Sequence, residues 1–221
     1  MCNLFHPSRD RRPFRVVKCY VGNLPPMPGA FPDYPAPVIR NMDAGTEMVT
    51  VRWGMPPPPR TGGPPVTNIR NTSSPRWRGW LKPENRCLAP ANSFAEYAPE
   101  PNPEPKNDVV WFVLNEDRPL FALAGMWTTF NGDRGTTSKP IPGPHQVYGF
   151  PTTEANAVVK PIHRKAMRDR QSLALDAREW PLREDHKSAA LFASEQRAPR
   201  PGCGADNSWQ YMRSILRCMS A

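Results

Sequence analysis

The second residue of the chain, Cys2, is the first candidate for covalent chemistry. An initiator methionine is normally removed when the next residue is small, so we expect the mature chain to begin at Cys2. Such a chain end carries an α-amine and a thiol on adjacent carbon atoms. The amine, with an unperturbed pKa of about 7.7–8.0, can form a Schiff base with an aldehyde, and the thiol can then close a five-membered thiazolidine ring. The alternative is that cysteine stands at this position by chance.

Two ionisable side chains could move the protons that such a condensation requires. Glu96 lies within the apolar run 93–97, where a carboxylate must be paired, exposed or functional. His163 lies in the segment 161–164 beside basic groups, and an imidazole titrates near neutral pH. The alternatives are an outward-facing strand residue for Glu96 and an ordinary surface histidine for His163.

Asn68 and Arg70 are two residues apart, which puts both side chains on one face of a strand. A guanidinium can hold a phosphate through two hydrogen bonds, and an amide can orient a reacting group. The pair therefore indicates a polar site that recognises a phosphate-bearing molecule.

Tryptophans alternate with arginines at two places in the first half of the chain. The residues concerned are Arg52, Trp53, Arg76, Trp77, Arg78 and Trp80. Aromatic rings among arginines are typical of proteins that bind single-stranded nucleic acid, where bases stack and phosphates pair with cations. The alternative is a set of core tryptophans flanked by solvated arginines.

Short runs of β-branched and aromatic residues predict the strands that must position these side chains. The runs cover residues 14–21, 38–40, 47–54, 66–70, 86–90, 93–97, 109–114, 120–127 and 147–153. Turns are expected at 43–45, 91–92 and 115–119, the last joining the clearest strand pair. The prolines of residues 22–37 should forbid a regular ladder there, and residues 99–105 should form a hairpin tip. Residues 155–166 contain one possible short helix, broken near Pro161, and no convincing strand is expected from Arg168 onward.

We therefore predict an α+β protein with a curved, mainly antiparallel sheet or open barrel and a few short helices in a single domain. Composition agrees with this class. Thirty prolines among 221 residues exclude a helical bundle or a coiled coil. Seven tryptophans and nine phenylalanines are too many for a disordered chain.

The charge of the chain points to a polyanionic partner. The net charge is +9, and it is distributed as +6 over residues 1–100, −2 over 101–159 and +5 over 160–221. Basic regions around a slightly acidic middle are typical of nucleic-acid-binding proteins. A soluble protein that happens to be basic is the alternative.

The cysteines and the chain start indicate a reducing compartment. The five cysteines are Cys2, Cys19, Cys87, Cys203 and Cys218, with no CxxC pair. The first residues show no apolar stretch of a secretion signal, and no run approaches the roughly 18 apolar residues of a membrane helix. We expect free thiols, a cytoplasmic location and no membrane association. Cys2 and His6 could form half of a metal site, but no second pair has metal-ligand spacing, so we expect no metal and no organic cofactor.

Six motifs, in order, resemble those of the SOS response-associated peptidase (SRAP) family. They are Met1-Cys2, Val51-Arg52-Trp53-Gly54-Met55 with Pro following, Asn68-Ile69-Arg70, Arg86-Cys87-Leu88-Ala89-Pro90 leading to Phe94-Ala95-Glu96-Tyr97, Phe121-Ala122-Leu123-Ala124-Gly125-Met126-Trp127, and Thr152-Thr153-Glu154-Ala155-Asn156 leading to Ile162-His163. The resemblance covers residues 2–167, which we expect to form an SRAP-like domain. Residues 168–221 are expected to be a divergent C-terminal segment of uncertain fold.

The resemblance implies a sensor of abasic sites in single-stranded DNA, and it implies roles for particular residues. Proteins of this family crosslink to the ring-opened abasic sugar through their terminal cysteine, which is also credited with autoproteolytic removal of the initiator methionine or a short leader. Carried over to this chain, Cys2 is the nucleophile, Asn68 positions it and the sugar, and Glu96 is the acid/base for ring opening and imine formation. His163 moves the proton of the sugar hydroxyl and helps to reverse the crosslink. Arg70 and Thr152 would contact phosphate or sugar, Trp53 would stack near a DNA junction, and Arg76 and Arg78 would bind DNA.

The chain departs from the family after Met167, where Arg168, Asp169 and Arg170 replace the usual Met-Pro and apolar strand. A divergent end, a frameshift and a decayed prophage or genomic copy are the open explanations. The resemblance implies action in the bacterial cytoplasm, near the nucleoid, as a monomer with possible lyase-like activity. Two other functions stay open: a cysteine peptidase that cuts other proteins with Cys2 and His163, and a non-catalytic single-strand-binding module in which Cys2 is incidental.

Overall fold

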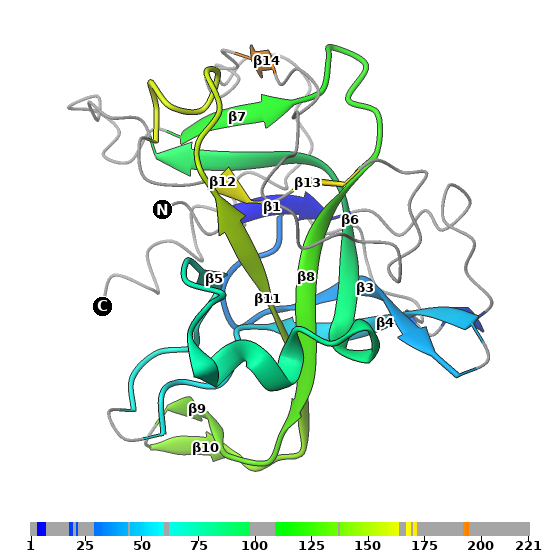
Figure 1. Ribbon diagram of the computed structural model, residues 1–221, viewed down its shortest axis with the longest axis vertical. Helices are drawn as coiled ribbons and strands as arrows, with labels where there is room; N and C mark the ends of the chain where they lie inside the picture. Colours follow the sequence, from blue (N-terminus) through cyan, green and yellow to red (C-terminus); the bar gives the residue numbers. More distant parts are fainter. Residues whose placement is uncertain are drawn as a thin grey trace.

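A computed structural model describes residues 4–7, 18–19, 21, 29–43, 45–59, 62–97, 109–136, 138–163, 167–168, 170–171 and 192–194. Within these ranges the chain forms one curved, mixed sheet and a separate two-stranded ribbon, rather than a closed barrel (Figure 1). The predicted fold class is confirmed. Cys2, the turn region 99–105 and all of residues 14–17 and 22–28 lie outside the described residues.

The main sheet has twelve strands. They are β1 (Leu4–Pro7), β2 (Lys18–Cys19), β3 (Pro35–Met42), β4 (Gly45–Trp53), β5 (Asn68–Ile69), β6 (Arg86–Tyr97), β7 (Val109–Val113), β8 (Phe121–Phe130), β11 (His145–Thr153), β12 (Met167–Arg168), β13 (Arg170–Gln171) and β14 (Phe192–Ser194). The central order is β13-β8-β11-β4-β3-β6-β7-β14, and β6 also pairs with β8, so the sheet bends back on itself. The ribbon consists of β9 (Arg134–Thr136) and β10 (Lys139–Ile141).

Pro35 and Pro37 belong to β3, so the proline-rich connector expected over residues 22–37 is wrong for residues 35–37. Pro35 pairs with Arg52 and Pro37 with Thr50 in the antiparallel β3–β4 ladder. Alternate residues of a strand direct their N–H groups to the same side, so both missing donors face one edge. The strand on that side, β6, reaches β3 only at Ile39 and Arg40, so the prolines remove no ladder hydrogen bond.

The strand β6 is continuous from Arg86 to Tyr97, and the turn expected at 91–92 is absent. Its first half, residues 86–91, pairs with β8, and residues 94–97 pair with β7. The strands predicted at 109–114 and 120–127 therefore exist as β7 and β8. Each pairs with a different half of β6, and the two do not pair with each other. One strand, β6, thus occupies residues 86–97, where the sequence predicted two strands joined by a turn.

The helices of the described residues are two short 3-10 helices, η1 (Pro75–Trp80) and η2 (Pro83–Asn85). The helix expected within residues 155–166 is instead a series of turns over the described part, with His163 N–H donating to the carbonyl of Val159 at 2.7 Å. No described helix is long and apolar enough to cross a membrane.

Strands also follow Arg168, contrary to expectation. Arg170 pairs with Leu123 of β8, and Ser194 pairs with Trp111 of β7. Backbone pairing needs no apolar alternation, which is why the polar composition of these short segments did not predict it. The sheet therefore includes residues beyond the boundary at 167.

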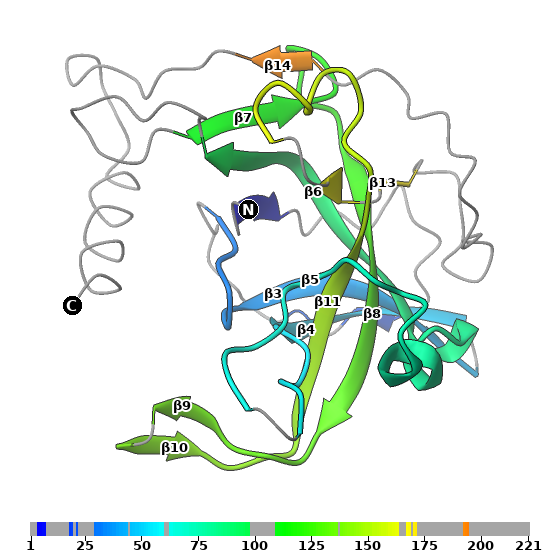
Figure 2. The same ribbon diagram turned by 60° about the vertical axis from the view of Figure 1, so that its left-hand side comes forward.

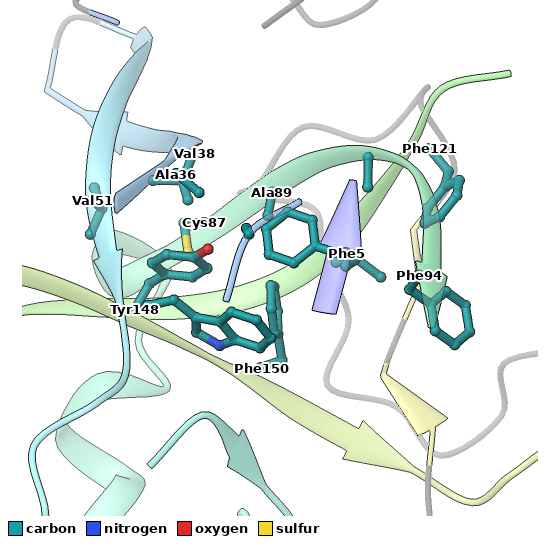
Figure 3. Packing of buried hydrophobic residues seen from close by; sticks show 14 of the residues in the cluster. Phe5, Ala36, Val38, Val51, Cys87, Ala89, Phe94, Phe121, Tyr148 and Phe150 are labelled. Atoms are coloured by element: carbon teal, nitrogen blue, oxygen red, sulfur yellow. The ribbon is translucent and has the colours of Figure 1, made fainter. Parts of the chain in front are cut away.

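Two buried clusters lie on opposite faces of the β8–β11 layer. The larger contains Tyr148 and Phe150 of β11 with Trp53, Phe5 and Phe94 (Figure 3). The smaller contains Val147, and its other buried members are Met55, Ile69, Trp77 and Met126. Successive strand residues point to opposite faces, so Val147 and Tyr148 assign the two clusters to the two sides. We call these the Phe5 face and the η1 face.

Candidate active site

Strand β1 brings the N-terminal part of the chain to β6, directly beside Glu96. Leu4 pairs with Ala95 and Phe5 with Phe94 in an antiparallel ladder. The Phe5 side chain is fully buried, with its ring centroid 5.3 Å from that of Trp53 and 5.7 Å from that of Phe150. Both contacts are edge-on, the favoured geometry for aromatic pairs. Phe5 therefore anchors the strand that follows Cys2.

Glu96 is a carboxylate built into an apolar wall. Its residue is 1% exposed, and its cross-strand neighbour is Val110. Alternation places Glu96 on the same face of β6 as Phe94, whose ring stacks on Phe112 at 5.0 Å. The Phe5 face therefore holds a buried carboxyl group, and burial strengthens the interaction of such a group with a nearby charge.

Asn68 is held on the edge of β11 by the parallel strand β5. It pairs with Phe150, and its Nδ2 donates to Oγ1 of Thr67 at 3.2 Å. The Thr67 carbonyl in turn accepts hydrogen bonds from Phe150 N–H at 3.0 Å and from Trp53 Nε1 at 3.3 Å. These bonds fix the segment that carries Asn68 to the core.

Gly149 lets that segment approach β11. A Cβ at this position would lie 2.8 Å from Met55 Cγ and 3.1 Å from the carbonyl oxygen of Val66. Met55 and Val66 pair with each other and lead into Asn68. A side chain at Gly149 would push this region off the strand.

Thr152 lies further along β11, and its Oγ1 donates to the carbonyl of Ile69 at 3.4 Å. It shares a face with Tyr148 and Phe150 by alternation. The hydroxyl is therefore close to the segment that carries Asn68 and Arg70.

His163 ends a turn that is packed onto the Phe5 face. Asn156 Oδ1 accepts the backbone N–H groups of Val158 at 3.1 Å and Val159 at 2.9 Å. Val159 is fully buried in the same cluster as Phe5, and Ile162 packs against it. The half-buried His163 thus follows directly from a segment docked on the cluster that Glu96 and Asn68 border.

The predicted catalytic side chains Asn68, Glu96 and His163 therefore come from three separate elements that meet at one buried cluster. Cys2, the predicted nucleophile, lies outside the described residues. The described strand β1 nevertheless begins at Leu4, two residues after Cys2, and Leu4 pairs with Ala95, the residue before Glu96.

The family model for the SOS response associated peptidase (SRAP) matches residues 11–195. The chain belongs to the SRAP family. A solved protein from Bordetella bronchiseptica is similar to it with 19% identity and a TM-score of 0.55, covering 88% of this chain and 100% of that one. A phage-related protein from the same organism has 14% identity and a TM-score of 0.55, covering 88% and 95%. No curated protein matches the sequence.

Trp53 does not present a face for stacking in this SRAP protein. Its residue is 0% exposed, with Tyr148 stacked at 6.4 Å and Phe5 and Phe150 edge-on. Its indole N–H already donates to Thr67. In this structure Trp53 therefore has no exposed ring face on which a base could stack, and its hydrogen bond to Thr67 supports the segment that carries Asn68.

The predicted DNA-binding arginines separate into two groups. Arg70 is exposed and stands two residues after Asn68. Arg76 and Arg78 lie on η1, whose Trp77 belongs to the η1 face. The β8–β11 layer lies between η1 and β1 (Figures 1 and 2). The structure thus does not bring Arg76 and Arg78 to the catalytic side chains.

Cys87 is a described thiol on the Phe5 face, and its environment makes it unreactive. The side chain is buried, and burial raises its pKa far above the ordinary value despite the nearby Arg40 cation. A thiol rather than a thiolate is a poor nucleophile. Among the described residues, no group of three potential ligands from His, Cys, Asp and Glu could hold a metal ion.

Sequence reasoning missed one polar cluster, at the corner where β4 ends. The buried Arg134 donates to the carbonyl of Gly54, and Arg52 donates to the carbonyl of Asp33 at 2.6 Å. Burial lowers the Arg134 pKa, while Asp33 raises it. The cluster ties the β9–β10 ribbon to the corner after Trp53. The sequence analysis included Gly54 in the strand run 47–54, whereas its φ is +143° in the structure, and nothing local marked Arg134 as its partner.

Proposed function

We propose that this SRAP protein captures the aldehyde of abasic sites in single-stranded DNA as a thiazolidine on Cys2, after removal of Met1. The observation that carries the proposal is the pairing of Leu4 with Ala95, next to the buried Glu96. Two peptide units join Cys2 to Leu4, so their Cα atoms are at most about 7.6 Å apart. This short connection supports a position for Cys2 close to Glu96.

The proposed reaction joins an amine, a thiol and an aldehyde with loss of one water. The α-amine of Cys2 adds to C1 of the ring-opened sugar, and the hydroxyl so formed leaves as water when it receives a proton. The resulting imine carbon is then attacked by the Cys2 sulfur, and the thiol proton ends on nitrogen. No oxidant, reductant or metal enters this balance.

Glu96 and His163 supply the proton transfers of this scheme. Glu96 delivers the proton to the departing hydroxyl, and its burial keeps the donor in a fixed, water-poor setting. His163 takes or returns the proton of the sugar hydroxyl during ring opening and reversal. General acid–base groups of this kind typically contribute about 10²- to 10⁴-fold in rate.

Recognition of the strand falls to polar groups at the border of the Phe5 face. Asn68 orients the sugar and the chain start, Arg70 holds a phosphate, and Thr152 adds a sugar or phosphate contact. The bidentate geometry of a guanidinium suits a phosphate better than an ammonium would. We place this activity in the bacterial cytoplasm and in the response to DNA damage, in line with the family's description.

A second candidate is peptidase activity, which the family's description favours. In its simplest form Cys2 assists the removal of Met1 from its own chain. Cleavage of other proteins by Cys2 with His163 would require turnover of a peptide substrate. A binding module without covalent chemistry would bind intact and abasic strands equally.

The experiment is incubation of the protein with a single-stranded oligonucleotide that contains one abasic site, followed by a denaturing gel. We expect a heat-stable, shifted band, and no such band with a Cys2→Ala variant or with an intact strand. A protein shown to lack Met1 that still gives no band would refute the proposal.

A further inference from the structure

We propose that the η1 face carries a second nucleic-acid contact surface, separate from the covalent site, that binds the sugar–phosphate backbone of single-stranded DNA whether or not it carries a lesion. The surface consists of the exposed parts of residues 75–86. The inference relies on the proposed function only for the kind of polyanion that is bound.

The charge of this segment is strongly one-sided. Its charged side chains are Arg76, Arg78, Lys82, Glu84 and Arg86, four basic and one acidic. Arg78 and Lys82 are exposed, while Arg76 and Arg86 are half-buried. Burial lowers the pKa of Arg76 and of Arg86. Because the pKa of an arginine lies far above neutral pH, both guanidinium groups stay charged. The segment therefore offers a cluster of fixed cations to a polyanion.

The backbone that carries these cations is fixed to the sheet. Asn41 Nδ2 donates to the carbonyl of Pro83 at 2.9 Å, and Trp127 Nε1 donates to that of Glu84 at 3.1 Å. Asn85 Nδ2 returns a bond to the Trp127 carbonyl at 3.1 Å. The turn η2 is therefore preorganised, which reduces the entropy lost when a ligand binds.

Aromatic rings lie among the cations. Trp77 is buried against the sheet, and its ring lies 4.7 Å from the Arg76 guanidinium and 5.7 Å from the half-buried Trp80. Arg76 is held further by a hydrogen bond to the carbonyl of Pro56. Cations beside a partly exposed indole are the combination that sequence-tolerant single-strand binders use.

The location explains how one strand could use both surfaces. Arg70 is exposed and directly follows β5, the short strand paired with β11. Residues 71–74 lead from Arg70 to η1. A strand seated at the covalent site would pass Arg70 at the edge of the sheet before reaching Arg78 and Lys82. Contacts on the η1 face would thus lengthen the binding footprint without touching the reacting sugar.

The test measures equilibrium binding of an intact single-stranded 30-nucleotide oligonucleotide as a function of salt. Each neutralised phosphate contributes about −0.7 to the slope of log K against log salt. The Arg78→Ala/Lys82→Ala double variant should lower the slope's magnitude by about 1.4, which is an affinity loss of about 25-fold at 0.1 M salt. Lys82→Ala alone should lower it by about 0.7, whereas Lys139→Ala, on the exposed ribbon strand β10, should leave it unchanged.

Crosslinking of a short abasic oligonucleotide is measured on the same variants. A thermal unfolding midpoint equal to that of the parent protein shows that the fold of the double variant is intact, as the inference requires. An unchanged slope in the double variant, or equal changes for Lys82→Ala and Lys139→Ala, would overturn the inference. If the parent protein shows no crosslink but the slopes differ as stated, the proposed function fails and the second surface stands.

Discussion

The two faces of the β8–β11 layer contain similar residue types in different arrangements. On the Phe5 face, Trp53 and Glu96 are buried, and the N-terminal strand is packed among aromatic rings. On the η1 face, Trp77 anchors a short helix whose arginines point outward or lie over rings. Proton transfer needs fixed groups removed from water, whereas phosphate binding needs exposed cations. Under the two proposals, the Trp–Arg pattern therefore serves packing on the Phe5 face and phosphate binding on the η1 face.

The largest effect is expected for Phe5→Ala, which removes the anchor of β1. Loss of a fully buried phenylalanine typically costs about 3–5 kcal/mol of unfolding free energy. Denaturant unfolding measures this change. Ile141→Ala, at a residue that is 45% exposed, is the matched control and should change stability little. Equal losses in the two variants would show that β1 is not seated as described.

Glu96→Gln should slow crosslink formation by roughly 10²-fold while leaving binding of an intact strand unchanged. The amide keeps the shape of the side chain but cannot transfer a proton. Single-turnover crosslinking rates between pH 5 and 9 measure the effect. Glu154→Gln is the control, because Glu154 is an exposed carboxylate that directly follows β11, whereas Glu96 is buried on β6. If Glu96→Gln shared the parent's rate and pH profile, Glu96 would have no catalytic role.

Arg70→Ala should lower the magnitude of the salt slope for single-strand binding by about 0.7, the value for one phosphate. Its effect should add to that of the Arg78→Ala/Lys82→Ala variant, because the proposed contacts of these residues are with different phosphates. Salt titrations of the single, double and triple variants give the comparison. A slope that stays constant after Arg70→Ala would remove this residue from the interface.

The smallest effect is expected for Cys87→Ala in the crosslinking assay. The buried thiol of Cys87 is held protonated, because burial raises its pKa far above neutral. Crosslink yield should therefore equal that of the parent, while Cys2→Ala gives none. A lower yield in a Cys87→Ala protein that is still folded would mean that Cys87 takes part in the chemistry.

Local patterns predicted several of the strands. The runs at 47–54, 120–127 and 147–153 correspond to β4, β8 and β11, because alternating apolar residues face a common core. The carboxylate of Glu96 attracted attention because it interrupts such a run, and the structure does bury it. Its assigned role stays a prediction.

Long-range pairing could not be predicted from local pattern. Nothing near Pro35 and Pro37 shows that β6 stops short of them, and nothing near Ala91 shows that two strands share the halves of β6. The Trp–Arg pattern grouped Arg76 and Arg78 with Arg52 and Trp53, although the tryptophans of the two places lie in different buried clusters. Only the alternation of Val147 and Tyr148 across the sheet separates them.

The most direct test is mass spectrometry of the purified conjugate between the parent protein and an abasic oligonucleotide, after digestion of both parts. We predict an N-terminal peptide that lacks Met1 and carries the sugar remnant on Cys2, with the loss of one water from the summed masses. A remnant attached to a lysine or to another cysteine, or a conjugated peptide that retains Met1, would contradict the proposed chemistry.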